Sequence, residues 1–110
     1  MQSEHTVRTT RGTGMAHLSM HGRLAKQYWE TYRPQALEEL GTPEEQQDHF
    51  VGLDRRVKER IGSLADQMLL DVPMQERAAA RNAVRAQARE LVYDQEVFLP
   101  KEPGTEHREM

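Results

Sequence analysis

The chain has 110 residues, of which 36% are hydrophobic and 30% charged, with a formal net charge of -3 and no cysteine. This length allows one domain with one modest core, and a hydrophobic fraction below the usual value of about 45–50% argues against a large enclosed active site. The absence of cysteine excludes disulfides, thiolate nucleophiles and sulfur-ligated zinc, while the acidic balance argues against nonspecific coating of DNA. No stretch approaches the roughly 20 apolar residues of a membrane span, so a cytoplasmic protein is expected.

The first fourteen residues are polar, include two glycines and have no hydrophobic periodicity. Such a segment buries too little apolar surface to offset the entropy of ordering it, so residues 1–14 are predicted to form a flexible arm. The helical domain is predicted to span residues 15–99. Because Met15 and Met20 lie near its beginning, Met1, Met15 and Met20 are alternative starts of the chain.

The first helix is expected between about residues 19 and 40. Ser19 is placed to cap its N-terminus, and Gly41 occupies the position after the last turn that glycine favours. Six apolar residues share one side at helical spacing: Leu24, Tyr28, Trp29, Tyr32, Ala36 and Leu40. Because proline removes a backbone hydrogen bond and clashes with the preceding turn, Pro34 predicts a kink near residues 31–33.

The second helix has a clear start. Thr42, Pro43 and Glu45 combine a capping threonine, a proline in the first helical position and a glutamate placed for a capping box. The apolar residues that follow recur at spacings of three and four: Phe50, Leu53, Val57, Ile61, Leu64 and Met68. They occupy a stripe about 80° wide, which is close to a coiled-coil seam and predicts one dominant partner helix.

The third helix is predicted to begin at Pro73 and to run to about Leu99, where Pro100 stops it. Its expected buried side consists of Ala80, Val84, Ala88, Leu91 and Phe98. Residues 100–110 are polar and are predicted to form a flexible tail. Since the connections at residues 41–42 and 71–72 are short, neighbouring helices should be antiparallel. The fold class is therefore predicted to be all-α, either a three-helix antiparallel bundle or an extended helical hairpin with a packed, Pro-kinked first helix.

An arginine ladder runs along the third helix at a spacing of four residues. Its members are Arg77, Arg81, Arg85 and Arg89. None has a carboxylate three or four residues away in its own helix, and like charges at that spacing weaken a helix. In an antiparallel pair of the second and third helices, the ladder faces Asp54 and Lys58, so Asp54 is expected near Arg89.

The opposite edge of this helix pair is expected to be neutral, because Arg56 and Arg60 face acids of the third helix. Those acids are Glu76, Glu90 and Asp94. Two interpretations of the ladder remain open. It is either a solvated flank whose stems cover apolar surface, or a surface for nucleic acid or an acidic partner.

Tyr28, Trp29 and Tyr32 lie within five residues of one another near the expected kink. Tyrosine and tryptophan dominate binding hot spots, so the cluster is either a partner anchor or part of the core. His17 and His21 have the spacing of paired metal ligands, but no third ligand is close in sequence, and no metal or cofactor is predicted.

No arrangement typical of catalysis emerges. Ser63 follows Gly62 in mid-helix without a histidine nearby, and the acids lie on helix surfaces rather than in an apolar pocket. The segment Gly12-Thr13-Gly14 follows no predicted strand and lacks the third glycine of a phosphate loop. The sequence predicts a protein that is not an enzyme and that has no evident small-molecule substrate.

Three short motifs carry a resemblance to known proteins. They are His21-Gly22-Arg23-Leu24-Ala25 with Trp29, the GTPEE helix start at residues 41–45, and Phe98-Leu99-Pro100 with Glu102-Pro103-Gly104. Over roughly residues 20–104 the chain resembles uncharacterised small helical proteins of actinobacteria and of their phages and mobile elements. It is similar more distantly to TnpV-type transposon accessory proteins, through the spacing of the two central helices. The resemblance implies an accessory role in a mobile element and assigns no functional residue.

These observations together favour a helical accessory protein that acts through protein–protein interaction, with a protein partner or with a second copy of itself. The alternative is a DNA-associated regulator that places the arginine ladder on phosphates. Against this alternative are the acidic net charge and the lack of a short recognition helix after a tight turn.

Overall fold

The computed structural model describes residues 17–110, so the predicted arm of residues 1–14 lies outside the described part. Within these residues the protein is all-α, and no strand is present. The described α-helices are α2 (Met20–Tyr32), α3 (Pro34–Glu39), α4 (Pro43–Leu69) and α5 (Arg77–Glu96), and a 3-10 turn, η1 (Met74–Glu76), precedes α5. Among residues 17–110, no helix has the length and apolar character needed to cross a membrane.

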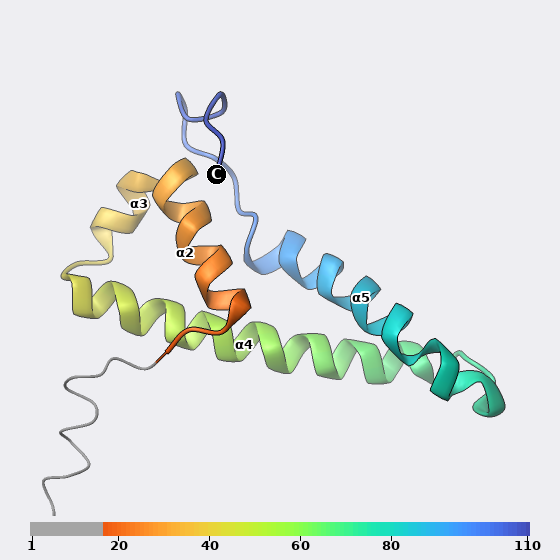
Figure 1. The fold of residues 1–110 in the computed structure, drawn as a ribbon. Coiled ribbons are helices and arrows are strands. Elements are labelled where there is room, and N and C mark those ends of the chain that lie inside the picture. Colours follow the sequence, from red (N-terminus) through yellow and green to blue (C-terminus); the bar gives the residue numbers. More distant parts are fainter. Residues whose placement is uncertain (1–16) are drawn as a thin grey trace, which may run out of the picture.

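Pro34 divides the predicted first helix into two. The helix α2 ends at Arg33, whose backbone leaves the helical region with φ -136° and ψ 50°, and Pro34 then takes the first position of α3. A residue before proline is disfavoured in the helical conformation, and proline itself accepts the first helical position without losing a hydrogen bond. The expected kink is therefore a complete break, after which α3 turns back from α2 (Figure 1).

The start of α4 agrees with its sequence pattern. The Glu45 N–H donates to Thr42 Oγ1 at 3.1 Å, and Glu45 Oε1 accepts from the Thr42 N–H at 2.8 Å. This is the predicted capping box. Gly41, just before this capping box, has a φ of +114°, a backbone conformation that residues other than glycine rarely adopt.

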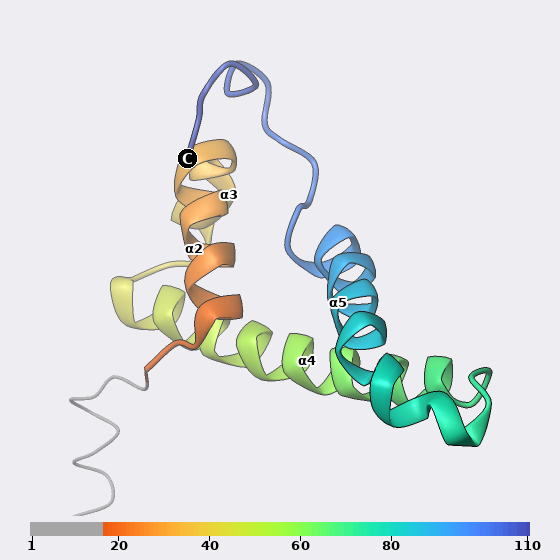
Figure 2. The same ribbon diagram turned by 45° about the vertical axis from the view of Figure 1, so that its right-hand side comes forward.

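The helices α4 and α5 run in opposite directions and cross obliquely (Figures 1 and 2). The buried row of α4 keeps a spacing of four residues and consists of Leu53, Val57, Ile61, Ala65 and Leu69. On α5 the buried row has the same spacing and consists of Val84, Ala88 and Val92. Ridges of residues four apart on both helices interlock when the axes cross at about 50°, rather than at the shallower angle of a coiled coil.

This crossing explains where the predicted buried sides were wrong. The sequence predicted Leu64 as a core residue of α4. In the structure Leu64 is only partly buried, and the neighbouring Ala65 is buried in its place. Leu91, expected in the core, is 45% exposed, because Val92 continues the row of four. The helix α5 also ends at Glu96 rather than near Leu99, which leaves Phe98 41% exposed.

Residues 100–110 were predicted to be a flexible tail, but the structure shows them held against α2 and α3. The Glu102 N–H donates to the Tyr32 carbonyl oxygen at 2.8 Å, and the Tyr32 hydroxyl donates to the Arg108 carbonyl oxygen at 2.7 Å. The Glu102 carboxylate accepts hydrogen bonds from the first free N–H groups of α3, at Gln35 and Ala36. The C-terminal segment thereby caps α3, and it passes from α5 to the far end of α2 (Figure 2).

Candidate functional site

The arginine ladder does not act as one uniform row. The Arg77 guanidinium donates to the carbonyl oxygens of Val72, at 2.9 Å, and Leu70, at 3.4 Å. These carbonyls belong to the turn that follows α4, so Arg77 closes the end of that helix in the way basic side chains often do. Two of its donors are thus engaged within the chain, which distinguishes Arg77 from the other members of the ladder.

The remaining three arginines form the unpaired part of the ladder. Arg81 and Arg85 are exposed, and Arg89 is half-buried. Among residues 17–110, no carboxylate lies within ion-pair distance of any of the three. The next position at the same spacing is Tyr93, whose hydroxyl lies 2.7 Å from Nδ1 of His21. The row of arginines therefore ends where α2 begins.

Asp54 was expected near Arg89, and both residues act electrostatically on His21 and Tyr93, but they form no ion pair because the Asp54 carboxylate is bonded to Ser19 instead. It accepts hydrogen bonds from both the backbone N–H and the hydroxyl of Ser19. Burial alone would raise the pKa of Asp54, but the hydrogen bonds from Ser19 and the nearby His21 and Lys58 lower it below its ordinary value. The Ser19 side chain is consequently diverted from the capping role predicted for it, and α2 has no side-chain cap.

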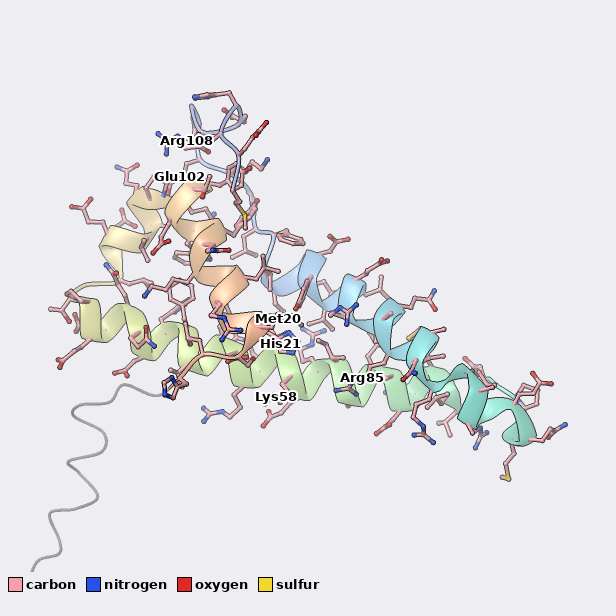
Figure 3. All side chains as sticks on the ribbon, in the orientation of Figure 1. Met20, His21, Lys58, Arg85, Glu102 and Arg108 are labelled. Carbon is pink, nitrogen blue, oxygen red and sulfur yellow. The ribbon has the colours of Figure 1, made fainter. Side chains whose placement is uncertain are left out.

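Three cations surround His21 at this junction. Burial lowers the pKa of His21, the Asp54 carboxylate opposes this effect, and Lys58, Arg89 and Arg85 lower the pKa further. Figure 3 shows His21, Lys58 and Arg85 in one region, where the first turn of α2 comes over α4 and α5. Because these three cations face a single carboxylate, that of Asp54, among the described residues that act on His21, the region carries a positive surplus.

The opposite edge of the α4–α5 pair was predicted to be neutral, but the ion pairs found there set one carboxylate, different from those expected, against two arginines. Glu96 pairs with Arg56 at 3.2 Å and with Arg60 at 2.5 Å. Glu96 follows Val92 by four residues and thus continues the row that faces α4. The acids proposed from the sequence, Glu76, Glu90 and Asp94, are exposed and form no ion pair with Arg56 or Arg60.

A cleft of about 560 Å³ opens between α2 and α5. Its lining residues are Met20, Arg23, Leu24, Gln27, Arg89 and Tyr93. The lining combines two aliphatic side chains and an aromatic ring with two arginines, and it contains no carboxylate. A second hollow, of about 420 Å³, shares Arg23 and Gln27 with this cleft, and its lining includes the carboxylate of Glu30 beside the cations Arg23 and Lys26.

The aromatic residues proposed as partner anchors lie in the core. Tyr28 and Trp29 are each 6% exposed and Tyr32 is 8% exposed. Trp29 packs edge-on against Phe50, with ring centroids 5.5 Å apart, and the Tyr28 hydroxyl donates to the Leu99 carbonyl oxygen. With this burial, an external partner cannot reach these rings without unfolding part of the domain.

The remaining candidates from the sequence are a metal site, the pair of His17 and His21, and Ser63. Within residues 17–110, no group of three or more His, Asp or Glu side chains is placed to hold a metal ion. His17 is exposed, whereas His21 is bonded to Tyr93, so the two do not act as a pair. Ser63 is exposed on α4.

Comparisons with protein-family models, curated proteins and solved structures find no match for this chain. The candidate site is therefore defined from the structure of this chain and not from known relatives. It consists of the cleft between α2 and α5 and of the unpaired arginines that lead up to it along α5. Sequence reasoning missed its α2 side, namely Met20, Arg23 and Leu24, although Tyr93 is detectable as the next position of the ladder.

Proposed function

We propose that this protein is a non-enzymatic accessory module that acts by binding another protein, and that its partner occupies the cleft between α2 and α5. The observation that supports this is the lining of the cleft. Met20 is 55% exposed there, and Leu24 and Tyr93 supply further apolar surface. Exposed apolar surface beside unpaired charge is typical of a protein-binding site rather than of a solvated helix flank.

In this proposal α4 and α5 form an extended helical hairpin, and the broken first helix packs on it to build one wall of the cleft. The cytoplasm is the proposed location. An accessory role in a phage or another mobile element is the context that the sequence resemblance implies, and a partner encoded by the same element is the first one to test.

Site-specific photo-crosslinking tests the location of the binding site. A photoreactive amino acid is placed at Leu24, inside the cleft, or at Leu70, an exposed apolar position in the turn after α4, and the native host is irradiated. The proposal expects one defined adduct from Leu24 and none from Leu70. Direct binding to the purified partner should then be weakened by Leu24→Asp and unchanged by Leu70→Asp. Equal adducts from both positions, or no effect of Leu24→Asp, would contradict it.

The same experiment addresses self-association. If the adduct from Leu24 joins two copies of this chain, sedimentation at several concentrations should show a dimer that Leu24→Asp converts to monomer. A strictly monomeric protein at high micromolar concentration would exclude a second copy as the partner.

A DNA-associated regulator is the second candidate function. It is favoured by the three unpaired arginines of α5 and by Lys58 beside them. A gel shift on duplex DNA at several salt concentrations tests it. If Arg81 and Arg85 contact phosphates, replacing both with glutamine should lower the salt slope by about 0.9 for each lost contact. An unchanged slope would remove this candidate.

A further inference from the structure

We infer that the segment bound by this surface is an acidic amphipathic helix. It would lie along α5 with carboxylates on Arg81, Arg85 and Arg89 and with apolar side chains in the cleft between α2 and α5. This inference rests on the proposed function, and it adds the chemical class of the partner. Three features of the surface carry it: the spacing of the arginines, the missing countercharge and the apolar end of the row.

The spacing fits a helical partner. Residues four apart on a helix lie about 6 Å apart along its axis, so the row from Arg81 to Tyr93 is about 18 Å long. A partner helix with glutamate or aspartate at every fourth residue repeats its carboxylates at the same interval of about 6 Å. A segment of about 12 to 15 residues therefore covers the row from Arg81 to the cleft.

The positive charges of the three unpaired arginines favour the binding of an external anion. Arg81, Arg85 and Arg89 repel one another at this spacing, and no carboxylate of residues 17–110 forms an ion pair with them. Lys58 adds a fourth cation from α4, near His21. The buried Asp54 carboxylate also acts on His21, but its single negative charge offsets only one of these four positive charges. Carboxylates of a partner would offset the remaining positive charges of this surface.

The apolar end of the row favours a protein over a nucleic acid. Met20, Leu24 and the Tyr93 ring line the cleft beside Arg89, and phosphates gain nothing from such contacts. Three free arginines and one lysine give about four phosphate contacts, too few to hold DNA well in physiological salt. An acidic amphipathic helix uses both the cations and the apolar side chains.

Fluorescence anisotropy with synthetic probes tests this inference on the full-length protein. The first probe is a labelled helical peptide of about 15 residues, with glutamate at every fourth position and leucine along the adjacent row. The second peptide has the same composition in a permuted order without an apolar side, and the third probe is a short DNA duplex. We expect the first probe to bind at least about tenfold more tightly than either of the others.

Charge reversal identifies the contact on the protein. Arg85→Glu should weaken binding of the acidic helix at least about tenfold, and a probe with lysine in place of glutamate should bind this variant better than the wild type. The control carries Ala83→Glu and Gln87→Glu, which lie exposed on the other flank of α5 and change the net charge by the same amount. This control should bind the acidic probe as the wild type does.

Each outcome decides between the alternatives. Equal binding of the permuted peptide or of DNA would show that the surface recognises charge alone, and would overturn the inference. The absence of any binding by the acidic helix would overturn it as well. Neither result would affect the proposed function, because that depends on the adduct formed from Leu24 and not on the probe peptides.

Discussion

Replacing Gly22 with alanine is expected to destabilise the protein, whereas the same substitution at Gly52 or Gly62 is expected to stabilise it. All three glycines lie within helices, where alanine is intrinsically favoured over glycine by about 1 kcal/mol. A Cβ added at Gly52 or Gly62 would meet nothing within 4 Å. Both variants of α4 should therefore gain close to that full amount.

The surroundings of Gly22 reverse the sign. A Cβ there would lie 2.9 Å from Leu18 Cδ2, 3.0 Å from Asp54 Cβ and 3.1 Å from Asp54 Cγ. The end of the leucine side chain can move aside, but Asp54 Cβ is fixed to the backbone of α4, and its Cγ is held by Ser19. Overpacking of this kind costs about 1–3 kcal/mol, which offsets or exceeds the helix gain of about 1 kcal/mol, so a net loss of up to about 2 kcal/mol is expected.

Thermal unfolding followed by circular dichroism measures this difference. The free energies of unfolding of Gly22→Ala and Gly62→Ala should therefore differ by about 1–3 kcal/mol, or roughly 4 °C or more in Tm for a domain of this size. If Gly22→Ala melts as high as Gly62→Ala, then α2 does not approach α4 as closely as described. The positions of Ser19, His21 and the cleft wall would then need revision.

Three further predictions concern the C-terminal segment, pH and the ladder. Glu102→Ala should lower the free energy of unfolding by about 1–2 kcal/mol and speed hydrogen exchange in α3, because it removes the cap of that helix; unchanged exchange would contradict this. Burial lowers the pKa of both His21 and His49, so the unfolded chain takes up protons first as the pH falls below about 6.5, and stability should decline there. Urea titrations at several pH values should show that decline, and changing both histidines to glutamine should flatten it. Replacing Arg81 and Arg85 with glutamine should leave the fold intact and raise Tm slightly, since it removes like-charge neighbours; a lower Tm would show that these side chains support the fold.

Local signals in the sequence were enough to place the helices. The capping residues around Thr42 and the effect of Pro34 are both properties of a few adjacent residues, and the structure agrees with them except that the kink is a break. The edge of α4 that carries Arg56 and Arg60 was also expected to be neutral. These features depend on spacing within one helix or on the general direction of its neighbour.

Features that depend on the angle between helices could not be predicted. Buried residues at alternating spacings of three and four differ little from buried residues at a constant spacing of four. The first pattern buries Leu64 and Leu91, and the second buries Ala65 and Val92. The oblique crossing of α4 and α5 decides this, and no local pattern reports it. The contact between Ser19 and Asp54 was equally hidden, although an acid beside Leu53 and Val57 on the apolar side of α4 was a signal that it had a buried partner.

The attachment of the C-terminal segment also has a kinetic consequence. Thr105 Oγ1 lies 3.1 Å from the Tyr32 carbonyl oxygen, a contact between residues 73 positions apart, whereas α4 and α5 are joined by a short turn. Nearby contacts form early and distant ones late, so the α4–α5 pair should fold first and the closure of residues 102–108 onto α2 should come last. Substitutions at Glu102 should then act mainly on the rate of unfolding. The last residues of the described chain would thus set the lifetime of the folded state, although they lie outside every helix.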